Sequence, residues 1–183
     1  MPRYIAFLRA VNVGGRVVKM TQLKEIFEST GLSNVETFIA SGNVIFSTKS
    51  ANVTALARKI EAALERDLGY EVPIMIRTDA EVAELARRKH SVFTKAEVDG
   101  AHSLSIGLLN EPLSKAAVAA MATFNGDVEQ FRTHEREIYM LLLQPTLKST
   151  FALKKFEKVL QMVTTFRNVN TMERLARKYP VAP

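Results

Sequence analysis

Residues 35–48, VETFIASGNVIFST, contain two short runs of strand-forming residues, Val35–Ala40 and Val44–Thr48. The tripeptide Ser41-Gly42-Asn43 separates them. Gly and Asn adopt a positive φ at low cost, so this tripeptide favours a tight hairpin between antiparallel strands. The other elements have to be arranged around these two strands, which are consecutive in the chain.

The elements on either side of this hairpin complete one structural unit. Before it, the pattern predicts an apolar strand at Tyr4–Val11 and a helix that ends at Gly31. After it come a helix that ends by Gly69, a strand at Val72–Ile76 and a helix capped by Asp79. Strand, helix, strand, strand, helix, strand is the βαββαβ order of a ferredoxin-like unit.

The second half of the chain predicts the same order. Its expected elements are a strand at Leu104–Leu109, a helix at Ser114–Phe124, strands at Val128–Arg132 and Ile138–Leu143, a helix at Phe151–Leu160, a strand at Val163–Phe166 and a last helix. Arg77, Leu85, Ala86 and Arg87 recur, in the same order and spacing, as Arg167, Leu175, Ala176 and Arg177. We therefore predict an α+β protein of two ferredoxin-like halves that arose by internal duplication, with an extra helix after each half. The expected boundaries are residues 1–89, a linker at 90–100, and residues 101–183.

Composition excludes several classes of protein. The chain has 183 residues, of which 47% are hydrophobic and 24% charged, as in ordinary globular proteins. It contains no cysteine, which excludes disulfides, cysteine-ligated metal centres and cysteine nucleophiles. The apolar run at the N-terminus is too short for a signal peptide, and no stretch is long enough to span a membrane. We expect a cytoplasmic protein without a membrane partner.

The positive charge is concentrated at one end of the sequence. The net charge is +6, and residues 147–183 contain eight basic and two acidic residues while the rest of the chain is balanced. Lys154, Lys155 and Lys158 share one face of the expected helix at Phe151–Leu160. Basic helices of this kind can bind nucleic acid, although the same lysines also suit an ordinary solvated helix face.

The predicted topology brings two glycine-containing segments together. In a ferredoxin-like unit, the loop after the first strand and the hairpin between the second and third strands open at the same edge. Backbone amides and arginines at such an edge could hold an anion. The candidate ligand-binding residues are Arg9, Asn12, Gly14, Gly15, Arg16, Ser41 and Asn43. Neither segment matches a known phosphate-binding motif, so the glycines could instead serve only to turn the chain.

A second group of candidates lies where a fourth strand meets a helix in each half. These residues are Arg77, Arg167, Asn168 and Asn170. For the asparagines, the alternative role is capping of the last helix. For Arg167, the alternative is a structural ion pair or a contact with a carbonyl group.

The sequence contains no recognisable catalytic group. His90, His102 and His134 fall in the expected linker, at a strand start and in a turn, and no histidine is placed to activate a serine. No spacing of histidines or carboxylates suggests a metal site. We therefore assign no catalytic residue, no metal ligand and no cofactor, and the sequence argues against an enzyme more than for one.

Three segments resemble the signature segments of a bacterial family known as domain of unknown function 1697. They are Arg9–Gly15 (RAVNVGG), Ser41–Phe46 (SGNVIF) and Arg167–Thr171 (RNVNT), in the family's order and spacing. The resemblance covers nearly the whole chain and implies a fold of paired ferredoxin-like units, but no catalytic residue. The chain departs from the family at Val169, where a tryptophan is usual, and in Gln144–Ser149, which lacks the glycine common after Pro145.

Three functions are compatible with these features. The leading hypothesis is a small binding module for an anionic or nucleotide-like ligand at the glycine loops. The alternative is nucleic-acid binding through the basic C-terminal helices, and the third is an enzyme of unidentified reaction.

Overall fold

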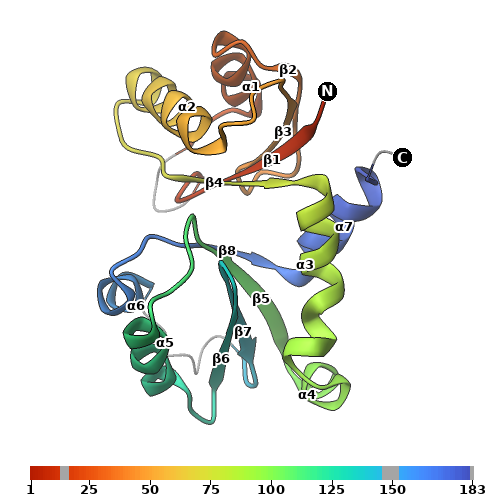
Figure 1. Ribbon diagram of the computed structural model, residues 1–183, viewed down its shortest axis with the longest axis vertical. Coiled ribbons are helices and arrows are strands. Elements are labelled where there is room, and N and C mark those ends of the chain that lie inside the picture. Colours follow the sequence, from red (N-terminus) through yellow and green to blue (C-terminus); the bar gives the residue numbers. More distant parts are fainter. Residues whose placement is uncertain (13–16, 146–152, 182–183) are drawn as a thin grey trace. The chain divides into compact units, whose positions relative to one another are not determined.

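The computed structural model in Figure 1 describes residues 1–12, 17–145 and 153–181. The chain forms two compact units: Met1–Glu81 together with the C-terminal end from Val181, and Val82–Pro180. Each unit contains one four-stranded antiparallel sheet and helices, which confirms the predicted α+β class. Among the described residues, no helix has both the length and the hydropathy needed to cross a bilayer.

The first unit is built around strand β1, which pairs antiparallel with β3 on one side and β4 on the other. The strand order in the sheet is β2-β3-β1-β4. The elements are β1 (Arg3–Leu8), α1 (Met20–Ser29), β2 (Ser33–Thr37), β3 (Asn43–Ser47), α2 (Val53–Leu68) and β4 (Ile74–Thr78). The two central strands of this order are therefore the first and third of the chain.

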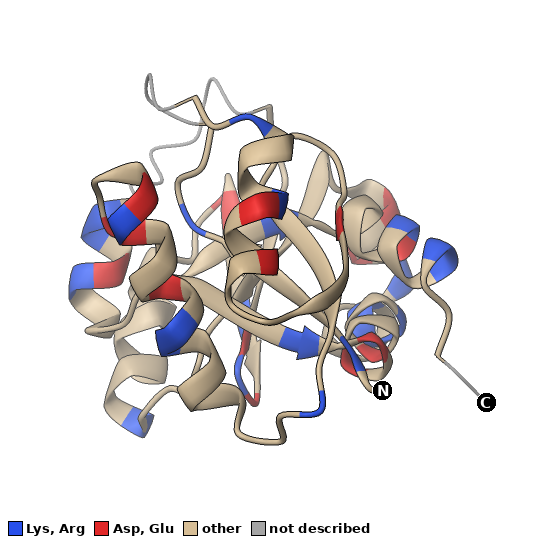
Figure 2. Ribbon diagram, turned by 90° about the horizontal axis from the view of Figure 1, so that it is seen from above, with Lys and Arg blue, Asp and Glu red and all other residues tan. Residues whose placement is uncertain are grey.

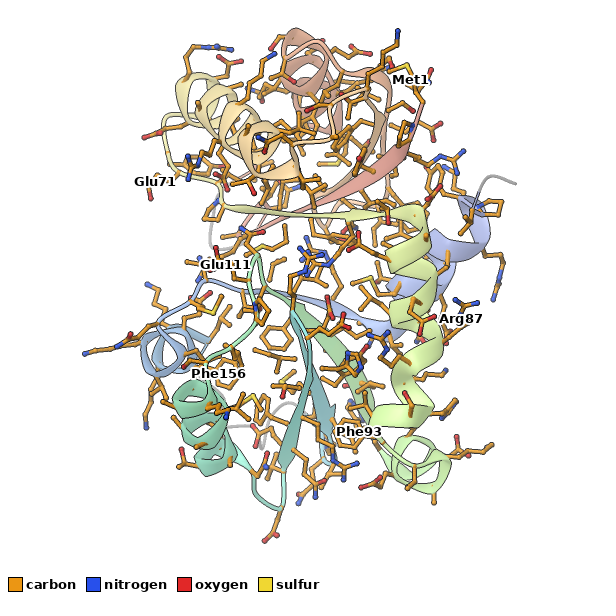
Figure 3. All side chains as sticks on the ribbon, in the orientation of Figure 1. Met1, Glu71, Arg87, Phe93, Glu111 and Phe156 are labelled. Carbon is orange, nitrogen blue, oxygen red and sulfur yellow. The ribbon has the colours of Figure 1, made fainter. Side chains whose placement is uncertain are left out.

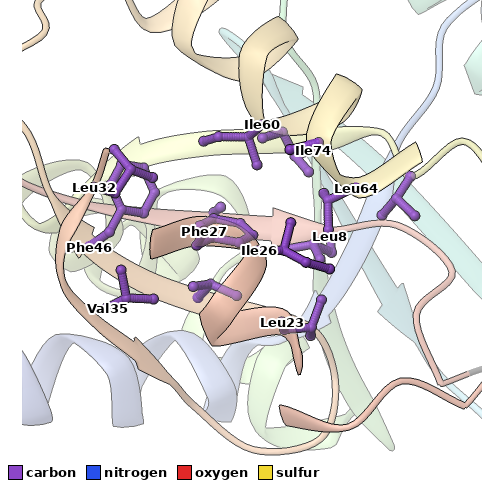
Figure 4. Close-up of a cluster of buried hydrophobic side chains, with 14 of the residues drawn as sticks. Leu8, Leu23, Ile26, Phe27, Leu32, Val35, Phe46, Ile60, Leu64 and Ile74 are labelled. Atoms are coloured by element: carbon purple, nitrogen blue, oxygen red, sulfur yellow. The ribbon is translucent and has the colours of Figure 1, made fainter. Parts of the chain in front are cut away.

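Helices α1 and α2 cover one face of this sheet because both are amphipathic. Alternate residues of β1 point into the core, as expected for a strand of period two. Opposite them lie the apolar faces of the two helices, with Phe27 packed against Phe46 at 5.9 Å between ring centroids. Figure 4 shows this cluster, which includes Leu8, Leu23, Ile26, Phe27, Leu32, Val35, Phe46, Ile60, Leu64 and Ile74.

The second unit has the matching strand order β6-β7-β5-β8. Its elements are α3 (Asp79–Val92, which starts in the first unit), α4 (Lys95–Gly100), β5 (Ser103–Leu108), α5 (Lys115–Met121), the short 3-10 helix η1 (Ala122–Phe124), β6 (Glu129–His134), β7 (Glu137–Leu142), α6 (Leu153–Leu160), β8 (Thr165–Asn168) and α7 (Val169–Lys178).

Both faces of the second sheet are covered. On one face, Phe131 and Ile138 pack with Phe156 of α6 (Figure 3) and with α5. On the other face, Arg132 donates a hydrogen bond to the carbonyl oxygen of Val92 at 2.7 Å, and its guanidinium lies 4.2 Å from the ring centroid of Phe93. These contacts fix the C-terminal part of α3 against strand β6.

Two local features differ from the expectations drawn from the sequence. Residues 90–100, expected to form a linker, are largely helical, since α3 extends through Val92 and Thr94 starts α4 with a capping box to Glu97. The hairpin around Ser41-Gly42-Asn43 is wider than a tight turn, because β2 ends at Thr37 and Asn43 already belongs to β3.

Candidate functional site

The loop after β1 and the loop between β2 and β3 are joined by the side chain of Asn12. Its amide nitrogen donates to the carbonyl oxygen of Ala40 at 3.0 Å, and its carbonyl oxygen accepts from the Val18 N–H at 2.7 Å. The carboxamide of Asn12, in the loop after β1, therefore contacts two other segments: the residues just before α1 and the β2–β3 loop. The two loops that the topology placed at one edge are in direct contact.

Asn43 and Gly42 hold the β2–β3 loop from its other side. The fully buried Asn43 amide donates to the carbonyl oxygen of Phe38 at 3.0 Å and to Ser41 Oγ at 2.8 Å. Gly42 has φ +72°, and a Cβ at this position would lie 3.2 Å from the Cβ of Leu8 and 3.3 Å from that of Val11. Glycine is needed here for both reasons, since the loop passes close to the end of β1.

The backbone of the two loops adopts conformations that residues with a side chain rarely take. Ala10 and Asn12 both have φ +57°, and Ile39 has φ +51°. A β-branched residue such as Ile39 is costly in this region, at about 1–2 kcal/mol. Strained residues of this kind concentrate at functional sites.

Several backbone N–H groups in the two loops have no acceptor among the described residues. They belong to Ala10, Val11 and Asn12 in the first loop and to Ile39, Ala40 and Ser41 in the second. In the first loop, Val11 lies between two left-handed residues and does not itself have a positive φ. Successive backbone N–H groups in alternating right-handed and left-handed conformations can form anion-binding concavities. We call the six residues Ala10–Asn12 and Ile39–Ser41 the loop edge.

Two cationic residues, Arg9 and Lys19, lie close in sequence to the first loop of the loop edge. Arg9 is half-buried, and its backbone N–H donates to the carbonyl oxygen of Pro73 at 2.9 Å. Lys19 is exposed at the start of α1, a helix end without a side-chain cap and without an acidic residue in its first turn. The positive end of that helix is thus available to a negative charge. The predicted residues Gly14, Gly15 and Arg16 lie outside the described residues.

The two arginines of the second candidate group are buried and donate to backbone carbonyl oxygens. Arg77 is 1% exposed and donates to the carbonyl oxygen of Ile76 at 3.0 Å. Arg167 is 8% exposed and donates to Thr165 Oγ1 at 2.8 Å and to the carbonyl oxygen of Phe166 at 2.9 Å. Burial lowers the pKa of Arg167 to about 10. The contact with a carbonyl group, one of the alternatives drawn from the sequence, is present for both arginines.

The two asparagines beside Arg167 have distinct positions. Asn168 caps α7, because its side chain accepts from the backbone N–H of Asn170 at 2.9 Å. Asn170 itself is exposed in the first turn of the helix. Val169 stands where a tryptophan is usual in the family that the sequence resembles. It is 7% exposed and lies at the start of the same helix.

Lys154, Lys155 and Lys158 form the exposed face of α6, while Phe156 and Leu160 of the same helix are buried. The predicted basic face is therefore present and open to solvent. Over the described part of the chain, basic and acidic residues are interspersed along most helices (Figure 2). The three lysines of α6 are therefore close together in the sequence, but they do not belong to a large basic surface.

Some groups at these sites were not predicted from the sequence. The unused amides of Ala10, Val11 and Ala40 belong to residues with unremarkable side chains, and their left-handed neighbours carry no sequence signal apart from the asparagine at 12. A histidine and two glutamates, His134, Glu135 and Glu137, also come within 4.8 Å of one another in the β6–β7 hairpin. The sequence His-Glu-Arg-Glu, which contains a two-residue turn, could have indicated this group.

The fold and the loop edge define a class: α+β proteins with two four-stranded antiparallel sheets and a hydrogen-bonded pair of loops at one end of the first sheet. The chain belongs to the family described as "Protein of unknown function (DUF1697)", whose family model matches residues 1–139. A comparison with curated proteins found no match.

One solved structure is similar over nearly its whole length. It is described as "The structure of conserved bacterial protein SP0830 from Streptococcus pneumoniae", with a TM-score of 0.68 and 19% sequence identity. The alignment covers 96% of this chain and 97% of that one. At this identity the likeness supports the fold and says nothing about a shared ligand.

Proposed function

We propose that the protein is a small binding module whose ligand is an anion, such as a phosphate group of a nucleotide-like molecule, held at the loop edge. The observation that carries the proposal is the set of N–H groups in two strained loops that have no acceptor among the described residues. An N–H group without an acceptor costs free energy unless water or a ligand supplies one.

The arrangement suits a negative charge better than a neutral ligand. Arg9 and Lys19 supply positive charge close in sequence to the first loop, and the uncapped start of α1 adds the helix dipole. Asn12 contributes by fixing the loops and has both ends of its carboxamide engaged. Its role in the proposal is to position the amides before the ligand arrives, which lowers the entropy cost of binding.

Isothermal titration with inorganic phosphate, sulfate and adenosine monophosphate tests the proposal. We expect saturable binding that weakens at least tenfold in Asn12→Asp, because the new carboxylate places a negative charge beside the amides. Asn52→Asp is the matched control, since Asn52 caps α2 in the same unit and Asp is an equally good cap. Equal affinity in both variants, or no binding by the native protein, would refute the proposal.

A second candidate function is nucleic-acid binding through α6, which rests on the exposed lysines Lys154, Lys155 and Lys158. If these lysines contact phosphates, the dependence of affinity on salt should weaken by about two to three counterions when all three are changed to Glu. The matched control changes three exposed lysines elsewhere to Glu, namely Lys24, Lys49 and Lys115. Equal loss of affinity in the two triple variants would show that net charge alone attracts the nucleic acid.

We further propose that the two units are ferredoxin-like and arose by internal duplication, and that the protein is cytoplasmic. The strand orders β2-β3-β1-β4 and β6-β7-β5-β8 correspond position by position, which supports the duplication. Arg77 and Arg167 occupy equivalent registers, opposite Ile5 and Ile106 in the central strands. A cell-fractionation experiment tests the location.

A further inference from the structure

A histidine and two glutamates meet at the end of the β6–β7 hairpin, in the second unit. His134 and Glu137 are cross-strand partners, and Glu135 lies in the two-residue turn between them with φ +51°. One possible ligand atom from each residue lies within 4.8 Å of the others. Glu137 is buried, His134 is half-buried and Glu135 is exposed, so the group is open to solvent on one side.

Arg88 of α3 contacts the histidine of this group. Its guanidinium lies 2.8 Å from His134 Nδ1. Arginine only donates hydrogen bonds, so Nδ1 must accept and the imidazole proton must lie on Nε2. Arg88 also reaches the carboxylate of Glu84, one turn earlier in α3, at 3.3 Å. Arg88 therefore keeps an anionic partner, Glu84, when it releases the imidazole of His134.

The hydroxyl of Tyr139 is a separate sign that the group is incomplete. Tyr139 is fully buried, and its hydroxyl has no hydrogen-bond partner among the described residues. It lies two residues after Glu137 in β7, so both side chains project from the same face of the sheet. A buried hydroxyl without a partner is costly, and a bound ion or its water would supply one.

We propose that His134, Glu135 and Glu137 bind a divalent transition-metal ion such as Zn²⁺, and that Arg88 occupies the position of the cation when the metal is absent. An imidazole nitrogen and two carboxylates are a suitable ligand set for Zn²⁺, with water in the remaining position. The nitrogen ligand favours Zn²⁺ over Mg²⁺, which prefers oxygen ligands only.

Binding of the metal requires an exchange of partners. The metal needs a free lone pair on His134, and Arg88 holds the one at Nδ1. When the metal binds, Arg88 turns to Glu84 and the imidazole donates its lone pair to the ion. Because the two cations compete, removal of Arg88 should strengthen metal binding. A purely structural Arg88–His134 contact predicts no such gain.

The test is isothermal titration of the untagged full-length protein with Zn²⁺, repeated with Mg²⁺. We expect one Zn²⁺ per chain, at least tenfold weaker binding in His134→Ala, and at least threefold tighter binding in Arg88→Gln. His102→Ala is the matched control, because His102 precedes β5 and is not in the group, and it should leave the affinity unchanged.

Circular dichroism of each variant establishes that it is folded. If His134→Ala unfolds the protein, Glu135→Gln, at an exposed turn position, takes its place with an expected loss of at least fivefold. The proposal is overturned if Zn²⁺ fails to bind, if His134→Ala or Glu135→Gln binds it as tightly as the native protein, or if Arg88→Gln shows no gain. This outcome is independent of the loop edge, which shares none of these residues.

Discussion

Replacement of Asn12 by alanine should destabilise the protein by about 3 kcal/mol. The change removes two hydrogen bonds, from Asn12 to the Ala40 carbonyl oxygen at 3.0 Å and from the Val18 N–H to Asn12 at 2.7 Å. Each contributes about 1 kcal/mol, and the backbone N–H of the buried Val18 loses its acceptor. Alanine at φ +57° adds about 1 kcal/mol of backbone strain.

Asn12→Gly separates these two effects. Glycine tolerates the positive φ, so this variant should lose about 2 kcal/mol, which is about 1 kcal/mol less than the alanine variant. Urea unfolding followed by circular dichroism measures the difference. With a slope of about 2 kcal/mol per molar urea, Asn12→Ala should lower the midpoint by about 1.5 M. A midpoint within about 0.3 M of the native value would show that the side chain of Asn12 does not hold the loops together.

Two further predictions concern the second unit. Gly107→Ala should destabilise it by about 1–3 kcal/mol, because the new Cβ would lie 2.7 Å from the Phe166 ring, whereas Gly126→Ala, with nothing within 4 Å, should be far milder in the same urea assay. The hydrogen bond from Arg132 lowers the pKa of Glu97 to about 2, so the stability that this pair contributes should be present above about pH 4.5 and be lost as the pH falls toward 2. Glu97→Gln should flatten that part of the stability profile, and an unchanged profile would contradict the assignment.

The order of the strands and helices could be predicted because it depends on the hydrophobic period. The alternation in Leu104–Leu109 and the apolar spacing of Leu56, Ile60 and Leu64 indicated elements that the structure contains. The ends of elements were less accurate. The linker expected at residues 90–100 looked polar, yet the capping box at Thr94 starts a helix there, which is a local signal that hydrophobic period does not capture.

The candidate site was only partly predictable. The contact between the loop of Asn12 and the loop of Ser41 follows from topology, because both loops leave the sheet at the same edge. The roles of the side chains could not be predicted from the topology. The side chains of Asn12 and Asn43 form hydrogen bonds within the loops themselves. The unused amides depend on the left-handed conformation of Ala10 and Ile39, for which neither residue type has any preference.

The most direct test of anion binding is a map of amide chemical shifts in ¹⁵N-labelled protein during titration with inorganic phosphate at constant ionic strength. We expect saturable shifts concentrated at the amides of Ala10–Asn12 and Ile39–Ser41, with sodium chloride at the same ionic strength producing none. Shifts that fall instead on Leu153–Leu160, or that are scattered and do not saturate, would contradict a binding site at the loop edge.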